Sequence, residues 1–283
     1  MIGEINMAHE NVILGIDIGC STTKIAAYSD VGALIATLRV VASDRLTSLY
    51  GAIGNLLSSH DIPLSSVKQM VLTGVGATYI EGDIYGIPTT RVSEFDAIGI
   101  GGLALSDKGS ALVVSMGTGT AFVRATKDRI EHIGGSGVGG GTLLGLAWHL
   151  FHETDYEDLA KLADSGTLEN IDLVVSDICK DCETPLPSHV TASNFGRLGT
   201  DATKEDLSLG IINMVFQTIG MLSAFALRND DIKDVVLIGA LASLPHGRQI
   251  LDAIEEISDV RFFVPDEAPF GTAIGAALPY TKA

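Results

Sequence analysis

The chain opens with an apolar run, a small-residue turn and a second apolar run. Residues 12–16 are apolar or glycine, which predicts a buried strand. Asp17 ends this run, residues 19–22 form the turn, and residues 24–28 start the second strand. We therefore expect a β-hairpin with a carboxylate at its bend.

Further strands and helices follow in a regular order. Apolar spacing predicts a strand at residues 33–40, a helix at 47–60 and a further strand at 67–73. Ser93 is the expected N-cap of a helix that reaches Leu105. Each glycine inside that helix costs about 1 kcal/mol relative to alanine. We therefore expect another backbone to pack closely against it.

The pattern of strand, small-residue turn and strand recurs over residues 111–125, with its turn at 117–120. Such a repeat predicts two similar units. Three strands, a helix and a strand are the opening of a ribonuclease-H-like half-domain. The expected fold is α/β, with two such half-domains, residues 1–108 and 109–283, and a nucleotide cleft between them. The last helix, over residues 270–278, is expected to pack back on the first half.

A glycine-rich stretch at residues 134–142 precedes the apolar residues 143–150. Glycines at a helix start let a ligand approach the backbone, where the helix dipole favours negative charge. Gly135, Gly137 and Gly140 also spell a dinucleotide-binding fingerprint. That fingerprint needs an acidic residue at the end of a second strand. The corresponding residues here have a helical pattern, so we reject this alternative.

The remaining elements complete the second half. We expect a polar helical region over residues 155–177 and a long helix, capped by Thr203, over residues 204–228. A strand at 234–238, a helix at 247–257 and a last strand at 260–264 are expected to follow.

Composition limits the possible partners. The 283 residues are 46% hydrophobic and 19% charged, with a net charge of −17. Nucleic acids and anionic membranes require basic surfaces, so we expect neither as a partner. The first ten residues lack the pattern of a signal peptide, and polar residues interrupt the apolar stretch 209–227. A cytoplasmic location follows as an expectation.

The two turns predict phosphate binding. Successive backbone N–H groups of a small-residue turn bind phosphate oxygens. A carboxylate beside phosphate suggests Mg²⁺, held by Asp17 directly or through water. The alternative is an ordinary hairpin in which Asp17 caps the turn. Two such turns facing each other would hold a polyphosphate from both sides.

Taken in order, these segments resemble the sugar kinase, heat-shock-70 and actin superfamily, and within it the type II pantothenate kinases. The resemblance covers most of the chain. The matching segments are GIDIGCSTTKI at 15–25, SEFDA at 93–97, MGTGT at 116–120, GGSGVGGGTLLGL at 134–146, TDY at 154–156, TASNFG at 191–196 and LIGA at 237–240.

The resemblance implies a site for ATP, and phosphoryl transfer from ATP would use Mg²⁺. The residues around the phosphates would be Gly19, Cys20, Ser21, Thr22, Thr23, Lys24, Ile25 and Ala26. Further nucleotide contacts would come from Thr118, Gly140, Gly141, Thr142, Leu143 and Leu144. Tyr156 and Ala240 would lie near the adenosine, with alanine where the family can have serine. A homodimer and the phosphorylation of pantothenate, the first step toward coenzyme A, are also implied.

Glu94 is the candidate catalytic base and a substrate contact. A primary alcohol must lose its proton as it attacks the γ-phosphoryl group, and a carboxylate within hydrogen-bond reach can accept it. The resemblance implies this role for Glu94. The alternative is that Glu94 is a first-turn acid favoured by the helix dipole. For Asp96 we expect a structural role.

His132 is the candidate substrate-binding residue that departs from the family pattern. The family has an arginine at this position, where it can bind the carboxylate of the substrate. Histidine lacks the permanent charge and the bidentate fork of arginine. Substrate affinity could therefore be weaker, or another cation such as Arg129 or Arg197 could substitute. The substrate could also be another small hydroxylated metabolite, such as a sugar or amino sugar.

Two further classes of protein remain as alternatives. Cys179 and Cys182 form one CxxC pair, which is weak evidence for zinc, and we expect surface thiols. The pair could instead supply ligands to an iron–sulfur cluster in an activator ATPase of the same fold. A nucleotide-binding protein without catalysis is disfavoured because Asp17, Lys24 and Glu94 are all present.

Overall fold

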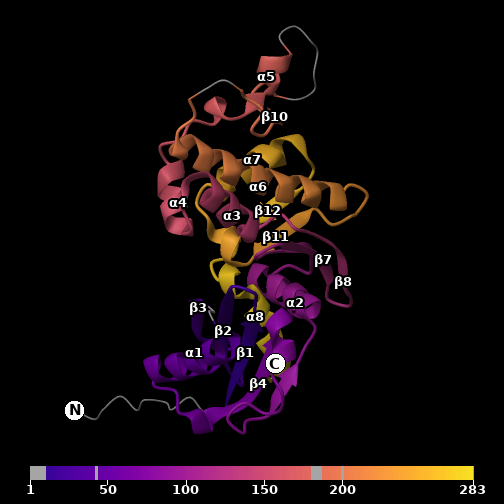
Figure 1. Cartoon of the computed structure of the whole chain (residues 1–283). Helices are drawn as coiled ribbons and strands as arrows, with labels where there is room; N and C mark the ends of the chain where they lie inside the picture. Colours follow the sequence, from indigo (N-terminus) through magenta and orange to yellow (C-terminus); the bar gives the residue numbers. More distant parts are fainter. Residues whose placement is uncertain (1–10, 42–43, 180–186, 199–200, 283) are drawn as a thin grey trace, which may run out of the picture.

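The structure is a computed structural model that describes residues 11–41, 44–179, 187–198 and 201–282. Two five-stranded sheets form its framework. Figure 1 shows one sheet in the lower part of the molecule and the other in the upper part, with two helices between them.

The first sheet contains the predicted hairpin. Its strand order is β3-β2-β1-β4-β5, and β1 pairs antiparallel with β2 and parallel with β4. Every residue of β1 is buried. The bounds are β1 (Val12–Ile18), β2 (Thr22–Ser29), β3 (Leu34–Val41), β4 (Val67–Thr73) and β5 (Thr89–Arg91).

The second sheet repeats the first. Its order is β12-β11-β6-β7-β8, and β6 pairs antiparallel with β7 and parallel with β11. The bounds are β6 (Ser110–Met116), β7 (Thr120–Thr126), β8 (Ile130–Ser136), β11 (Asp234–Ile238) and β12 (Arg261–Phe263). The predicted repeat and the α/β fold with two half-domains are therefore confirmed.

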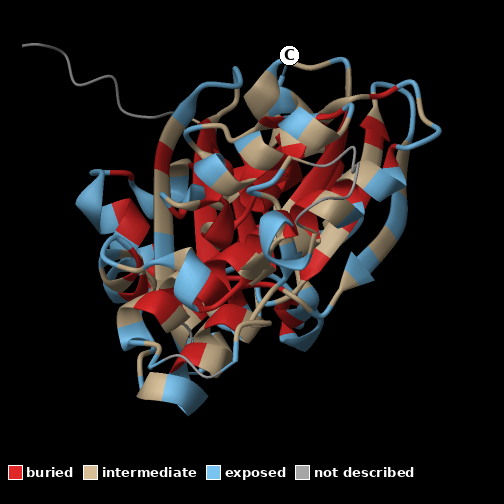
Figure 2. Ribbon diagram, turned by 90° about the horizontal axis from the view of Figure 1, so that it is seen from above, coloured by how far each residue is buried: buried red, intermediate tan, exposed pale blue. Residues whose placement is uncertain are grey.

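Helices bury the outer faces of the sheets. Helix α1 (Arg45–Ser59) packs on the first sheet, with Leu49, Ile53 and Leu56 fully buried. Helices α3 (Gly140–Phe151), α4 (Tyr156–Ala163), α6 (Lys204–Ala226) and α7 (Gly247–Ile257) contribute to the core of the second half. Helix α6 is long and apolar enough to cross a membrane, but 56% of its apolar window is buried inside the protein, as in a core helix. Figure 2 shows the buried residues gathered at the centre of the molecule.

The two helices between the sheets are α2 (Glu94–Ser106) and α8 (Gly271–Ala277). A Cβ at Gly101 would lie 1.9 Å from the Gly271 carbonyl oxygen, and one at Gly275 would lie 1.9 Å from that of Ala97. The close backbone approach predicted for the glycine-rich helix is confirmed, and its partner is α8.

Each of these helices also packs on a sheet. Ala273 and Ala277 of α8 pack with residues of the first sheet, and Gly15 of β1 lies against the α8 backbone. Ile98 of α2 packs with residues of the second sheet, although it precedes that sheet in sequence. The division at residue 108 stays a prediction, since α2 contacts both halves.

Two sequence predictions need correction. The region 155–177 is not one helical stretch: α4 ends at Ala163, and β9 (Leu173–Val174) and α5 (Val175–Ile178) follow. Strand β9 pairs with β10 (Thr191–Ser193), and neither strand has the apolar length that would have revealed it. Gly134 and Gly135 lie in β8, because they pair with β7, so the loop before α3 is shorter than predicted.

We predict that Gly101→Ala lowers the free energy of unfolding by about 3 kcal/mol, because the new Cβ would force α2 and α8 apart. Gly51 is a matched control inside α1, where an added Cβ meets nothing within 4 Å. Gly51→Ala should raise stability by about 0.5–1 kcal/mol. Urea unfolding measures both. Equal stabilities for the two variants would contradict the close crossing.

Candidate active site

A buried ion pair lies at the carboxyl end of β1. Asp17 and Lys24 are directly opposite each other in the β1–β2 register, so their side chains share one face of the sheet. The Lys24 Nζ lies 3.0 Å from the Asp17 Oδ2, and the side chains are only 11% and 9% exposed. Removing one partner of such a pair would leave an uncompensated buried charge.

The backbone after β4 closes around Asp17. Thr73 is the register partner of Asp17 on β4, and Gly74 follows it. Gly74 has a φ of +83°, and a Cβ there would lie 2.5 Å from the Asp17 Oδ1. Glycine is therefore required at this position. The sequence analysis did not assign this loop to the site, although the glycines that follow the strand at residues 67–73 were a visible signal.

Glu94 is the first residue of α2 and is half-buried. The predicted N-cap is confirmed, because the Asp96 N–H donates to the Ser93 Oγ at 3.4 Å. Burial raises the pKa of the Glu94 carboxyl, the charge of Asp17 raises that pKa further, and Lys24 opposes the shift. Glu94 therefore lies within electrostatic reach of the Asp17–Lys24 pair.

The two predicted turns meet. The Ser21 Oγ and the Thr118 Oγ1 are 3.5 Å apart, although one belongs to the first hairpin and the other to the second. Within the turns, the Gly19 N–H donates to the Thr22 carbonyl at 3.0 Å and the Gly117 N–H to the Gly119 carbonyl at 2.9 Å. The fold thus brings the two small-residue turns face to face.

The start of α3 is joined to the second turn. The N–H groups of Gly140 and Gly141 donate to the carbonyls of Gly117 and Thr118, both at 2.8 Å. The Thr142 Oγ1 accepts from the Gly139 N–H at 3.2 Å. The second turn and the helix start therefore form one unit, and two of the first amides of α3 are already engaged.

Tyr156 and Ala240 lie around this unit. A Cβ at Gly140 would come within 2.2 Å of the Tyr156 hydroxyl, which places that hydroxyl against the helix start. Burial raises the pKa of Tyr156, and the charge of Arg39 opposes the shift. Ala240 follows Gly239, whose Cβ would lie 2.6 Å from the Met116 carbonyl oxygen at the start of the second turn.

Several residues of the predicted nucleotide site have side chains in the core. Thr23, Ile25, Ala26 and Leu143 are fully buried. Leu144 packs partly against the core of the second half. Because backbone and side chain are buried together, these four residues expose no atom to a ligand in this structure. Gly19, Cys20, Ser21 and Thr22 are at least partly exposed.

His132 lies on β8 and stacks on Phe95. The ring centroids are 3.8 Å apart with an interplanar angle of 9°. Because Phe95 follows Glu94 in α2, the stack places the imidazole beside the helix start that carries the candidate base. The sequence analysis missed Phe95, although its position next to Glu94 was a signal.

No group of three metal-ligating side chains occurs within the described parts of the chain. Cys179 is disulfide-bonded, so the prediction of a free thiol is wrong for this residue. Cys182 lies outside the described residues. Cys20, in the first turn, is a free and exposed cysteine.

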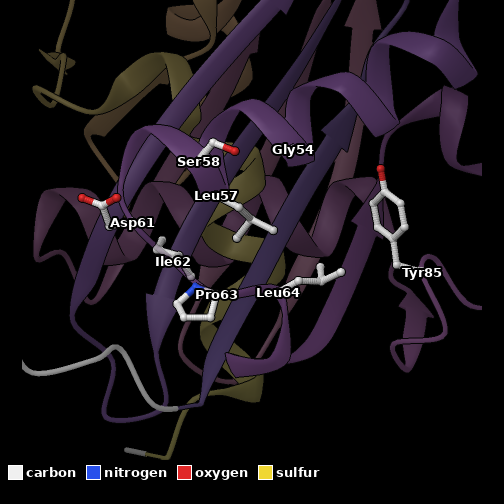
Figure 3. Close-up of a pocket in the computed structure, with 8 residues that line it drawn as sticks. All are labelled: Gly54, Leu57, Ser58, Asp61, Ile62, Pro63, Leu64 and Tyr85. Atoms are coloured by element: carbon white, nitrogen blue, oxygen red, sulfur yellow. The ribbon is translucent and has the colours of Figure 1, made fainter.

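A pocket of about 690 Å³ lies elsewhere on the first half (Figure 3). Leu57, Asp61 and Pro63 line it from the end of α1 and the loop that follows, and Tyr85 lines it from the opposite side. These segments precede β4 and β5, whereas Asp17 and Glu94 lie where the strands end. The pocket therefore belongs to the opposite edge of the sheet.

Comparison with known proteins places this chain in a family. The family model described as Fumble matches residues 108–255, just over half of the chain. A type II pantothenate kinase from Staphylococcus epidermidis is 31% identical over 278 residues, covering 93% of this chain and 98% of the relative.

Solved structures share the fold at lower identity. The activator of the 2-hydroxyisocaproyl-CoA dehydratase from Clostridium difficile, with bound ADPNP, has a TM-score of 0.68 and 18% identity, covering 95% of this chain and 94% of that one. A ROK hexokinase from Thermus thermophilus has a TM-score of 0.55 and 13% identity, covering 94% and 97%. The match of the family model to just over half of the chain and the 31% identity over 93% of it decide the family. The protein is a member of the type II pantothenate kinases.

Proposed function

We propose that the protein transfers the γ-phosphoryl group of ATP to the primary hydroxyl of pantothenate, giving 4′-phosphopantothenate and ADP in the first step of coenzyme A biosynthesis. Its relatives carry the name of this activity. The observation that carries the proposal is Glu94, a half-buried acid with a raised pKa beside the Asp17–Lys24 pair.

Glu94 acts as the base in this proposal. Its carboxylate accepts the proton of the substrate hydroxyl as the new O–P bond forms. The bond between the γ-phosphorus and the β–γ bridging oxygen breaks, and ADP leaves with that electron pair. A raised pKa makes the carboxylate a better proton acceptor than an ordinary glutamate.

The phosphates of ATP lie between the two turns. The contact between Ser21 and Thr118 is long, at 3.5 Å, and phosphate oxygens would replace it with hydrogen bonds to both hydroxyls. Since Gly140 and Gly141 donate to the second turn, they hold that turn against the start of α3. A structural neighbour of the same fold was solved with ADPNP, which supports nucleotide binding by this fold.

Asp17 fits the Mg²⁺ that a kinase of this kind uses. One carboxylate with phosphate oxygens and water is a common ligand set for Mg²⁺. The Asp17 carboxylate, whose Oδ2 accepts from Lys24, would hold the ion directly or through water. Bound Mg²⁺ neutralises charge on the transferring phosphoryl group.

A cytoplasmic homodimer is the assembly that we infer. Leu222 and Phe225 near the end of α6 are 38% and 62% exposed, which supplies apolar surface for a second copy. The net charge of −17 is compatible with a small-molecule substrate rather than nucleic acid or a membrane surface.

Glu94→Gln should lower kcat by about 10²–10⁴-fold, because the amide cannot accept the proton. Binding of MgADP should be retained. Asp96→Asn in the same helical turn is the matched control and should change kcat only slightly. A coupled assay of ADP release measures both variants. Undiminished turnover by Glu94→Gln would exclude the base.

The pH profile tests the same assignment. Glu94 must be ionised to accept a proton, so kcat/KM should fall as the pH drops through its pKa. The raised pKa places this fall above the ordinary value of about 4.3 for a glutamate. Asp17→Asn should move the fall in residual activity to lower pH, because removal of that negative charge lowers the Glu94 pKa. A shift to higher pH would contradict the proposed electrostatics.

His132→Arg tests the substrate. Arginine offers a permanent charge and a bidentate fork to the pantothenate carboxylate, so KM for pantothenate should fall about 10-fold with little change in kcat. The matched control is pantothenyl alcohol, which has the same reacting hydroxyl but no carboxylate, and its KM should not improve. An unchanged KM for pantothenate would remove His132 from the substrate site and favour another hydroxylated metabolite.

A further inference from the structure

A row of charged side chains crosses the first sheet beyond the ion pair. Lys24 pairs with Asp17 on β1 and with Arg39 on β3. Residues directly opposite in neighbouring strands place their side chains on the same face. Arg39 therefore extends the row from the centre of the sheet to its edge strand.

The packing of β3 confirms the face on which Arg39 lies. Its neighbours Leu38 and Val40 pack against the hydrophobic core under α1. Side chains alternate along a strand, so Arg39 is on the opposite face, which it shares with Lys24 and Asp17. This face carries the groups that act on Glu94.

Arg39 is the cation of the row that has no carboxylate partner among the described residues. Lys24 is committed to Asp17 at 3.0 Å in a buried environment. Arg39 is exposed, so its guanidinium retains all its hydrogen-bond donors for a ligand. The charge of Arg39 is therefore not neutralised within the row, whereas that of Lys24 is.

Arg39 also lies near the other half of the molecule. Its charge acts on Tyr156 of α4, whose hydroxyl lies against Gly140 at the start of α3. Figure 1 shows β3 in the lower half and α4 in the upper half on the same side of the molecule. Arg39 therefore lies within electrostatic reach of a residue that packs on the start of α3.

We propose that Arg39 is a further nucleotide-binding residue, whose guanidinium holds the phosphate chain from the β3 side opposite Tyr156. This inference rests on the proposed function. Arginine suits the task because its planar fork donates two parallel hydrogen bonds to one phosphate group. Lys24, held by Asp17, contributes charge to the same chain but cannot offer a fork.

Isothermal titration of MgADP and of adenosine tests the proposal. Arg39→Ala should weaken MgADP binding about 10-fold and leave adenosine binding unchanged, since adenosine has no phosphate. Arg39→Lys should recover part of the loss, because it keeps the charge without the fork. The matched control is Arg228→Ala, which removes another exposed arginine, just after α6, and should not change either affinity.

The outcomes separate the two proposals. Equal MgADP affinities for Arg39→Ala and the unaltered protein would overturn the role of Arg39 while leaving the kinase intact. A parallel loss of adenosine affinity would also overturn it, because the effect would then not involve phosphate. Failure of the unaltered protein to bind MgADP would overturn the proposed function on which the inference rests.

Discussion

The arrangement of the two halves depends on the close crossing of α2 and α8, where a glycine of each helix lies against a backbone carbonyl of the other. Gly101 lies against Gly271, and Gly275 lies against Ala97. Because no side chain separates the two helices, their relative position is set by backbone contact. Glu94 stands one turn before Ala97 in α2, so the same contact fixes the start of the helix that carries the acid. The two sheets and the candidate base are thereby positioned together.

The charges around Glu94 then set the pKa of its carboxyl. Asp17 and Lys24 neutralise each other in a buried setting, yet they act with opposite sign on the Glu94 pKa. Burial and Asp17 dominate, so the acid is tuned toward proton acceptance. The turns at residues 19–22 and 117–120 meet through Ser21 and Thr118, beside this group. Acid, ion pair and turns form one arrangement suited to phosphoryl transfer.

The repeated hairpins, the glycine-rich helix and its close partner could be predicted because period-two apolar runs and clustered glycines are local signals. The short strands β9 and β10 could not, since two or three residues carry no periodicity. Among the predicted site residues, Glu94 and the turns were singled out by their motifs. The stack of Phe95 on His132 and the position of Arg39 beside Lys24 depend on strand register and on packing between distant segments, which the sequence does not display.

The most direct test of this account is a crystal structure of the protein with pantothenate and a non-hydrolysable ATP analogue. The account predicts the triphosphate between the two turns and the primary hydroxyl of pantothenate within about 2.6–3.2 Å of the Glu94 carboxylate. A hydroxyl bound outside the reach of Glu94, with another residue at hydrogen-bond distance from it, would contradict the account.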